Sequence, residues 1–272
     1  MSPASNVLGD SVEHVLSSSL RAASGPVYVI GPSDAVVESL VEFAVGADAP
    51  PELRVLAGES QLKSVMGDFL VASHASDLVA SGSLDLRSTA EGTSNTLLVT
   101  ESSVVAVVAA GDSVAGLTTD DESFVESAHE AYRERFEDAE AFRLRTPALS
   151  EVRSSLEDDL GGDVRDEFDG VLDSLQSVDG ADGIDEVTIS LLVAARNEVL
   201  LYDVSKWGED VGIASKATFS RTKSDLEERG LIETEKVPID VGRPRLRLRL
   251  ADERLADADL DELAAVARDL LN

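Results

Sequence analysis

The sequence predicts two units of different fold class: an α/β N-terminal domain (an open mixed sheet with helices) and a C-terminal winged helix-turn-helix domain. Short apolar runs alternate with amphipathic stretches before residue 150, which is typical of an α/β sheet. Three amphipathic stretches between residues 184 and 230 precede two runs with period-two alternation, the element order of a winged helix-turn-helix. A segment rich in Gly, Asp and Ser separates the two patterns. We therefore expect domains at residues 1–176 and 185–250, a linker at 177–184 and an amphipathic helix in 251–272.

Strands and helices are expected to alternate in the N-terminal part. A β-rich run at 27–30 is followed by Gly-Pro-Ser-Asp and a helical pattern, and a second strand at 53–58 is followed by one long helix. The sequence then predicts a third strand within 83–90 and two adjacent strands within 95–119, joined by a tight turn at Glu101–Ser103. A helix over 120–142 and an acidic helical region over 149–176 complete this part. The order favours a sheet with both parallel and hairpin strands.

The composition is unusually acidic, with 23 Lys and Arg against 53 Asp and Glu and a formal net charge of −30. An acidic surface can bind a basic partner, or it can keep a protein solvated in a salty cytoplasm. The acidic residues are spread along the whole chain rather than gathered in a tail, which favours the second interpretation. This composition resembles that of haloarchaeal proteins.

Several classes of site are not expected. The chain has no cysteine, which excludes disulfides and zinc–thiolate sites. His14, His74 and His129 are far apart without metal-ligand spacing, so neither a metal nor another cofactor is expected. No apolar run approaches the ~20 residues of a membrane span, and the N-terminus lacks the basic region of a signal peptide. We expect a soluble, cytoplasmic protein with no membrane contact.

The positive charge is concentrated in the predicted C-terminal domain. Residues 1–184 hold 10 basic and 34 acidic side chains, whereas residues 185–250 hold 11 and 12. That domain ends in RPRLRLRL, in which Arg243, Arg245, Arg247 and Arg249 occupy every second position. Period-two alternation places the leucines of this run on the core side and the arginines on the outer face. Nucleic-acid contact is the favoured interpretation; a solvated face neutralised by nearby carboxylates and a protein-interaction surface are the alternatives.

Three helices are predicted ahead of the hairpin. The first spans about 184–199, and the second lies in 203–212 with Asp203 or Ser205 as its N-cap. A short turn at 212–214 leads to the third helix, which begins at the N-cap Ser215 and ends at Gly230. Phe219, Thr222 and Leu226 form its inner side.

The run SKATFSRTKSDLEERGLIE is similar to the recognition helix and wing start of many archaeal and bacterial winged-helix regulators. GRPR resembles the wing of TrmB-type archaeal regulators, and the whole chain resembles the haloarchaeal transcriptional regulators called TbsP, which are linked to sugar metabolism. Lys223 departs from this pattern, because such helices usually carry Leu there. The resemblance implies a sequence-specific regulator of transcription that binds double-stranded DNA. The residues expected to contact DNA are Lys206, Ser215, Lys216, Ala217, Thr218, Ser220, Arg221, Arg243, Arg245 and Arg247.

Two strand-to-helix turns are candidate contacts for a small anionic effector, for which the resemblance suggests a sugar phosphate. They hold Gly31, Ser33 and Asp34 after the first strand, and Gly58, Ser60 and Lys63 after the second. The carboxyl ends of neighbouring strands line a common crevice in open α/β sheets. Neither turn has a dinucleotide-binding or P-loop pattern, so simple turns with a helix cap are the alternative.

The protein is expected to be a homodimer, because winged-helix regulators usually bind paired half-sites. Residues 251–272 either pack on their own domain or pair with a second subunit, and pairing is favoured; the acidic helices at 120–176 are a rival surface. No nucleophile and base fall in a recognisable pattern, so we do not expect an enzyme. The alternative function is an α/β scaffold whose winged helix mediates protein–protein contacts.

Overall fold

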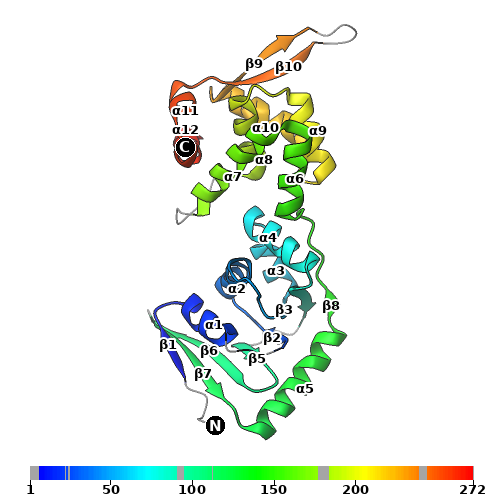
Figure 1. Cartoon of the computed structure of the whole chain (residues 1–272), viewed down its shortest axis with the longest axis vertical. Helices are drawn as coiled ribbons and strands as arrows, with labels where there is room; N and C mark the ends of the chain where they lie inside the picture. Colours follow the sequence, from blue (N-terminus) through cyan, green and yellow to red (C-terminus); the bar gives the residue numbers. More distant parts are fainter. Residues whose placement is uncertain are drawn as a thin grey trace. The chain divides into compact units, whose positions relative to one another are not determined.

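The computed structural model describes residues 6–21, 23, 25–90, 95–111, 113–176, 184–238 and 244–271. The chain divides into two compact units, Met1–Ala148 and Leu149–Asn272 (Figure 1). The first is a mixed α/β unit and the second is a helical unit that ends in a hairpin and two helices. No helix within the described residues is long and apolar enough to cross a membrane.

The N-terminal unit contains an eight-stranded open sheet with the order β1-β7-β6-β5-β2-β3-β4-β8. Only β2, β3 and β4 run parallel to one another, and the remaining neighbours are antiparallel. This arrangement confirms the predicted mixed sheet. The strands are β1 (Val7–Gly9), β2 (Val27–Ile30), β3 (Leu53–Gly58), β4 (Leu84–Thr89), β5 (Thr96–Val99), β6 (Val104–Ala110), β7 (Ser113–Thr119) and β8 (Glu140–Ala141).

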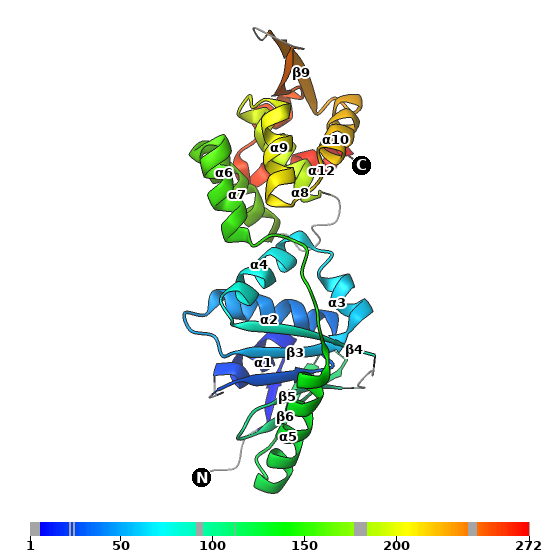
Figure 2. The same cartoon turned by 90° about the vertical axis from the view of Figure 1, so that its right-hand side faces the viewer.

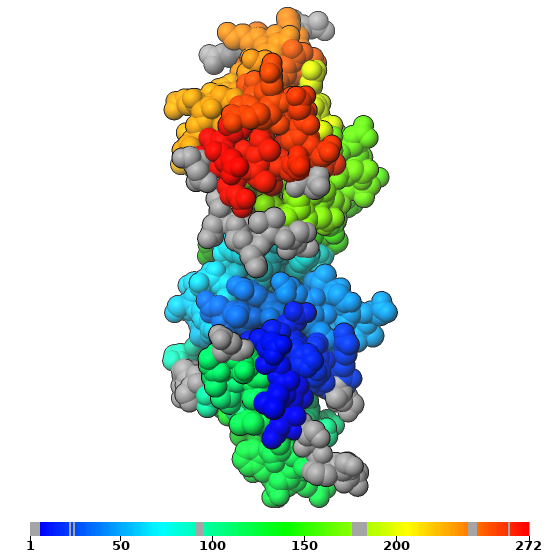
Figure 3. Space-filling view, turned by 90° about the vertical axis from the view of Figure 1, so that its left-hand side faces the viewer, coloured from blue at the N-terminus to red at the C-terminus, as the bar shows by residue number. Residues whose placement is uncertain are grey.

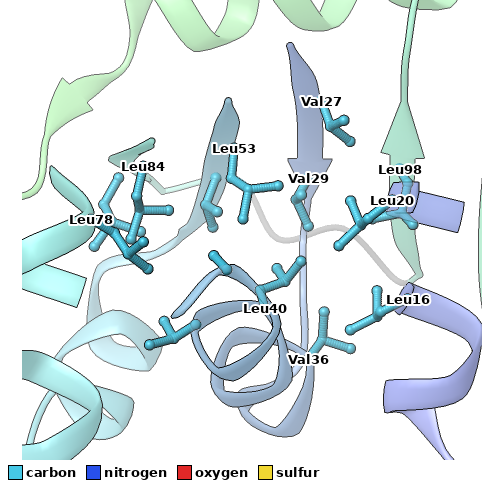
Figure 4. Packing of buried hydrophobic residues seen from close by; sticks show 14 of the residues in the cluster. Leu16, Leu20, Val27, Val29, Val36, Leu40, Leu53, Leu78, Leu84 and Leu98 are labelled. Carbon is cyan, nitrogen blue, oxygen red and sulfur yellow. The ribbon is translucent and has the colours of Figure 1, made fainter. Parts of the chain in front are cut away.

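Helices cover both faces of this sheet, which explains why all four residues of β2 are buried. Val27 and Val29 point to the face covered by α1 and α2, and Figure 4 shows them opposite Leu40 and Leu20. Tyr28 and Ile30 point to the other face, where they pack with residues of α5. The helices of this unit are α1 (Val12–Arg21), α2 (Asp34–Gly46), α3 (Glu59–Val65), α4 (Phe69–Ala80) and α5 (Glu122–Asp138).

Two details of the N-terminal prediction were wrong. The long helix expected after β3 is divided into α3 and α4, because the Asp68 side chain accepts a hydrogen bond from the Val71 amide and begins a new helix. The region 95–119 holds three strands rather than two. The turn at Glu101–Ser103 joins β5 to β6, and a second reversal at Gly111, with φ +60°, separates β6 from β7.

The C-terminal unit contains the helix-turn-helix order that the sequence predicts, followed by an antiparallel hairpin (Figure 2). Its second helix begins at Leu201, earlier than predicted, and Ser205 is buried inside it rather than capping it. The elements of this unit are α6 (Leu149–Leu160), α7 (Gly162–Gln176), α8 (Glu186–Arg196), α9 (Leu201–Val211), α10 (Lys216–Glu228), β9 (Ile232–Val237), β10 (Arg245–Leu250), α11 (Glu253–Asp257) and α12 (Leu260–Leu271).

The division between the units differs from the boundary expected at 177–184, most of which lies outside the described residues. Helices α6 and α7 belong to the C-terminal unit. The reason is visible at Trp207 of α9, which is 1% exposed. Its indole Nε1 donates to Ser155 Oγ of α6 at 2.9 Å, and its ring packs edge-to-face with Phe168 of α7. The apolar faces of α6 and α7 thus complete the core of the helix-turn-helix.

The C-terminal helix packs on its own chain, contrary to the favoured expectation that it pairs with a second subunit. Leu263, Ala264 and Ala267 of α12 are buried within the C-terminal unit. The Leu260 side chain lies so close to Gly170 of α7 that a Cβ at that position would be 3.3 Å from it. Figure 3 shows α12, in red, on the surface of this unit. Its apolar stripe is therefore part of the unit's core.

Candidate nucleic-acid interface

The third helix of the helix-turn-helix, α10, starts at the predicted cap. Ser215 Oγ accepts a hydrogen bond from the Thr218 amide at 3.2 Å, which satisfies one of the free amides of the first turn. The preceding turn reverses at Gly212, whose φ of +90° is accessible to glycine at little cost. At the other end Gly230 adopts φ +75°, as expected of the residue that terminates the helix.

Helix α10 is held on α9 by the close packing of Phe219 against Gly208. Phe219 is fully buried, and its ring lies over Gly208, where an added Cβ would be 2.3 Å from Phe219 Cζ. Leu226, two turns further along, is also buried. Thr222, predicted to be on the inner side, is only half-buried. The inner side of α10 is therefore locked, and its orientation in the unit is set by packing.

The opposite side of the first two turns of α10 is open to solvent. Ser215, Lys216, Ala217, Ser220 and Arg221 are exposed, and Thr218 is half-buried. The structure thus brings together the residues that the sequence singled out on this helix. Small, hydroxyl and basic side chains on a helix N-terminus suit close approach to phosphates and base edges.

Two lysines at this surface, Lys206 and Lys216, form ion pairs with acidic residues of α9. Lys216 Nζ lies 2.5 Å from Glu209 Oε2, and Lys206 Nζ lies 2.6 Å from Asp210 Oδ2. Hydrogen bonds from Lys216 lower the pKa of Glu209, and the hydrogen bond from Lys206 lowers the pKa of Asp210. Both carboxylates are therefore ionised at neutral pH. Each carboxylate therefore neutralises a lysine that would otherwise be free to bind a DNA phosphate.

Arg221 and Lys236 differ from these cations, because neither forms an ion pair with another described residue. Arg221 is exposed on α10 and makes a long 3.4 Å hydrogen bond to Thr218 Oγ1. Lys236 is exposed near the end of β9. Lys236 was not predicted from the sequence, and period-two alternation would not have found it, because its register partner is Leu246 and it therefore lies on the face of the hairpin opposite the arginines.

The arginine stripe of β10 is more enclosed than expected. Arg245 lies 3.4 Å from Asp203 and stacks over the Tyr202 ring at 4.5 Å. Arg247 and Arg249 both approach Glu198, and Arg249 also pairs with Glu235 at 3.0 Å. All three side chains remain between about a third and two fifths exposed. The arginines therefore share one partly exposed face, and nearby carboxylates offset their charge. Arg243 lies outside the described residues.

The leucines of the same strand differ in how deeply they are buried. Only Leu248 is fully buried, while Leu246 and Leu250 are half-buried. The Leu248 amide donates to the Val199 carbonyl at 3.0 Å, and Leu200 forms an isolated antiparallel bridge with Arg247, so the chain before α9 lies alongside β10. This contact explains why Glu198 and Asp203 lie next to the arginines.

The hairpin is also tied to α10. Glu227 accepts hydrogen bonds from Lys223 Nζ at 2.6 Å and from Thr234 Oγ1 of β9 at 2.7 Å. Burial acts to raise the pKa of this carboxyl, but the two hydrogen bonds outweigh it and leave the pKa lowered. Lys223, at the position where the resemblance implies a leucine, thus binds a carboxylate that bridges helix and hairpin.

The effector residues predicted in the N-terminal unit are mostly engaged locally. Ser33 Oγ caps α2, and Asp34 accepts a hydrogen bond from Gln61 Nε2, which also binds the Pro32 carbonyl. Gly31, with φ +57°, accepts from Thr96. Gly58 precedes α3 without a side-chain cap. Lys63, one of the six, lines a pocket together with Arg143 and Arg145.

The comparison with protein families agrees with this division of the chain. A model of the "Transcriptional regulator TbsP-like, N-terminal" family matches residues 4–147, and the "Transcriptional regulator TbsP-like, C-terminal HTH domain" matches residues 148–268. The chain belongs to the TbsP-like transcriptional regulators. Its helix-turn-helix is therefore the DNA-binding domain of a transcription regulator. The family boundary also falls where the two compact units of this TbsP-like chain divide.

Solved structures are only distantly similar to this TbsP-like regulator. TrmBL2, an archaeal chromatin protein described as showing a novel mode of DNA binding, is 16% identical over 51% of this chain and 54% of its own, with a TM-score of 0.37. Nuc, a phospholipase D family member from Salmonella typhimurium, is 12% identical over 51% of this chain and 98% of its own, with a TM-score of 0.36. The alignment thus spans about half of TrmBL2. Among curated proteins, none matches the chain.

Proposed function

We propose that this regulator recognises a specific duplex DNA site by inserting the first two turns of α10 into the major groove, with the β9–β10 hairpin beside it. The observation that carries this proposal is the contrast between the two sides of α10. Phe219 locks its inner side onto α9, while its outer side presents small, hydroxyl and basic residues. A recognition helix needs this combination of fixed orientation and open N-terminal half.

Within this proposal the residues have different tasks. Ser215, Thr218 and Ser220 donate to phosphates or base edges, and Ala217 allows close approach. Arg221 is the main cationic contact, because its guanidinium forms no ion pair with another described residue that DNA binding would have to break. Lys206 and Lys216 contribute less, since each must share its charge with a carboxylate of α9.

The hairpin arginines are proposed as flanking contacts. Arg245 and Arg247 already compensate Asp203 and Glu198, so phosphate must compete with these carboxylates. Exposed ion pairs contribute only about 0.2–1 kcal/mol, which a phosphate contact can replace. Arg243, which precedes them, is included in the proposed site on sequence grounds alone.

We also propose a homodimer, formed through the sheet of the N-terminal unit rather than through α12. Leu8, Ala115 and Val108 lie in one row across β1, β7 and β6, and Leu117 continues the same face. Leu8 is 76% exposed and Leu117 is 48% exposed. Apolar side chains grouped in this way are typical of an interaction surface. Sedimentation velocity should show a dimer for the wild type and a monomer for Leu8→Asp/Leu117→Asp. The control variant Val45→Asp/Val79→Asp, which changes two other exposed apolar residues, should remain a dimer. A monomeric wild type would contradict the proposal.

The proposed biological setting is control of sugar metabolism in the cytoplasm of a salt-adapted cell, in response to an anionic metabolite. The acidic composition supports the salty setting, and the two-unit organisation supports a separate sensing part. Genome-wide mapping of bound sites tests this setting together with the main proposal. Discrete sites upstream of carbohydrate genes are expected. Uniform or absent DNA binding would instead favour the alternative, a scaffold whose winged helix contacts proteins.

A further inference from the structure

One pocket of the N-terminal unit differs in charge from the rest of that unit. It has a volume of about 740 Å³ and lies between α3, the end of β4 and residues 140–146 of the chain. Figure 2 shows the chain after β8, in green, passing beside α3. The volume is within the range of about 300–1,000 Å³ that is usual for small-molecule sites.

Basic residues gather at this pocket although they are scarce elsewhere in the unit. Residues 1–148 contain 8 Lys and Arg against 23 Asp and Glu, and three of the eight, Lys63, Arg143 and Arg145, line this pocket. Its acidic lining residues are Glu59 and Glu140. In two other pockets of this unit, acidic lining residues outnumber basic ones. The pocket is therefore the one of these three that suits an anion.

Two of the three cations are available to a ligand. Arg143 and Arg145 are exposed, and neither forms an ion pair with another described residue. Lys63 is shared, because its Nζ lies 2.6 Å from Glu59 Oε1. Two guanidinium groups offer forked donors that match the geometry of a phosphate.

The floor of the pocket is fixed by the core. Met66, Phe142 and Leu144 line it and pack against the main apolar cluster of the sheet. The chain that carries the arginines is tied at both ends: the Phe142 amide donates to the Leu86 carbonyl at 2.8 Å, and Ser76 Oγ donates to the Thr146 carbonyl at 2.8 Å. A ligand would thus enter a preformed site and would lose little of its binding free energy to ordering the protein.

We propose that this pocket binds a small organic phosphate, with Arg143, Arg145 and Lys63 around the phosphate and Glu59 and Glu140 accepting hydrogen bonds from ligand hydroxyl groups. Of the turn residues selected from the sequence, Lys63 alone belongs to this site. The proposal deepens the proposed function, on which its regulatory half rests, by giving the effector a place and a chemical class.

The position of the arginines in the chain supplies a route to the DNA-binding unit. Arg145 is four residues before Leu149, the first residue of α6 and of the C-terminal unit. A phosphate held by Arg143, Arg145 and Lys63 would add a link between α3 and the segment that leads to α6. The bound state would therefore favour those arrangements of the two units that a tethered connection permits. DNA affinity would change wherever those arrangements fit the half-sites better or worse.

Direct binding tests the site without DNA. Isothermal titration calorimetry of the full chain, at low and at molar KCl, would use glycerol phosphate, phosphoenolpyruvate, glucose phosphate and fructose bisphosphate, with glucose and succinate as controls. At least one phosphate should bind at low salt, glucose should not, and Arg143→Ala/Arg145→Ala should weaken binding at least about tenfold. The matched variant Arg21→Ala/Arg133→Ala, which removes the same charge elsewhere in the unit, should bind as the wild type does.

The proposal is overturned if no phosphate of this panel binds, if succinate binds as tightly, or if the double variant at Arg143 and Arg145 retains wild-type affinity. Thermal melting of the unliganded variants serves as the check on folding, and equal midpoints are expected because both arginines are exposed. Operator affinity with and without the bound phosphate tests the regulatory half. Phosphate binding without any DNA binding would refute the proposed function and leave the site standing, whereas DNA binding without phosphate binding would do the reverse.

Discussion

Lys216, the first residue of α10, is ion-paired with Glu209 of α9, with 2.5 Å between Nζ and Oε2. Both side chains are 43% exposed, so the pair lies at the surface that we propose to face DNA. The Lys216 amide also donates to Glu209, and these hydrogen bonds lower the pKa of the carboxyl. An ionised carboxylate therefore stands beside the proposed phosphate contacts and competes with DNA for the lysine.

Removing this competitor should strengthen DNA binding. For Glu209→Gln we expect affinity to rise roughly two- to fivefold, because Lys216 is released from a competing exposed ion pair and one charge that repels DNA is removed. Fluorescence anisotropy with a labelled operator measures the change. Glu253→Gln removes the same charge from α11 and should have a much smaller effect. Unchanged or weaker binding of Glu209→Gln would place this pair away from DNA.

The contact between Gly208 and Phe219 should be sensitive to a single methyl group. Gly208→Ala places a Cβ 2.3 Å from the Phe219 ring, so either the ring or α10 must move. We expect a loss of about 1–3 kcal/mol in the free energy of unfolding, as is usual for overpacked cores. Urea denaturation followed by tryptophan fluorescence measures it. Gly162→Ala, whose Cβ would meet no atom within 4 Å, should leave stability unchanged or slightly higher; equal effects of the two substitutions would contradict the packing described here.

The domain division can be tested through the single tryptophan. A fragment of residues 149–272 should fold cooperatively with Trp207 buried, because it retains Ser155 and Phe168. A fragment of residues 185–272, which starts after the linker expected from the sequence, lacks both partners. Its fluorescence emission should be shifted to longer wavelength and its unfolding midpoint lowered. Equal spectra and equal stability for the two fragments would show that α6 and α7 are dispensable to this core.

Local patterns in the sequence were sufficient for much of the fold. Ser215 and Gly230 mark the ends of α10 because capping depends on residues within one turn. The run Val27–Ile30 identifies a strand buried on both faces because all four residues are apolar. The break between α3 and α4 was missed, although Gly67 and Asp68 carry the signal for it.

Relationships between distant residues could not be obtained in this way. The amphipathic pattern of α6 and α7 shows that they have an apolar face, but not that Trp207 lies against it. Likewise, period-two alternation places the arginines of β10 on one face, but their partners Glu198 and Asp203 come from a segment more than forty residues away. The pocket cations Arg143 and Arg145 were overlooked for a similar reason, because they stand on a connecting chain without a motif.

The central claim is that the open side of α10 contacts DNA, and Arg221 tests it most directly. Operator affinity of Arg221→Ala should be compared by anisotropy with that of the wild type and of Arg254→Ala, over a series of KCl concentrations. Arg254 pairs with Asp252 far along the chain from α10, and its loss removes the same charge. The account predicts at least about a fivefold loss for Arg221→Ala, corresponding to about 1 kcal/mol, with Arg254→Ala near the wild type. Equal affinity of all three proteins for the operator would contradict it.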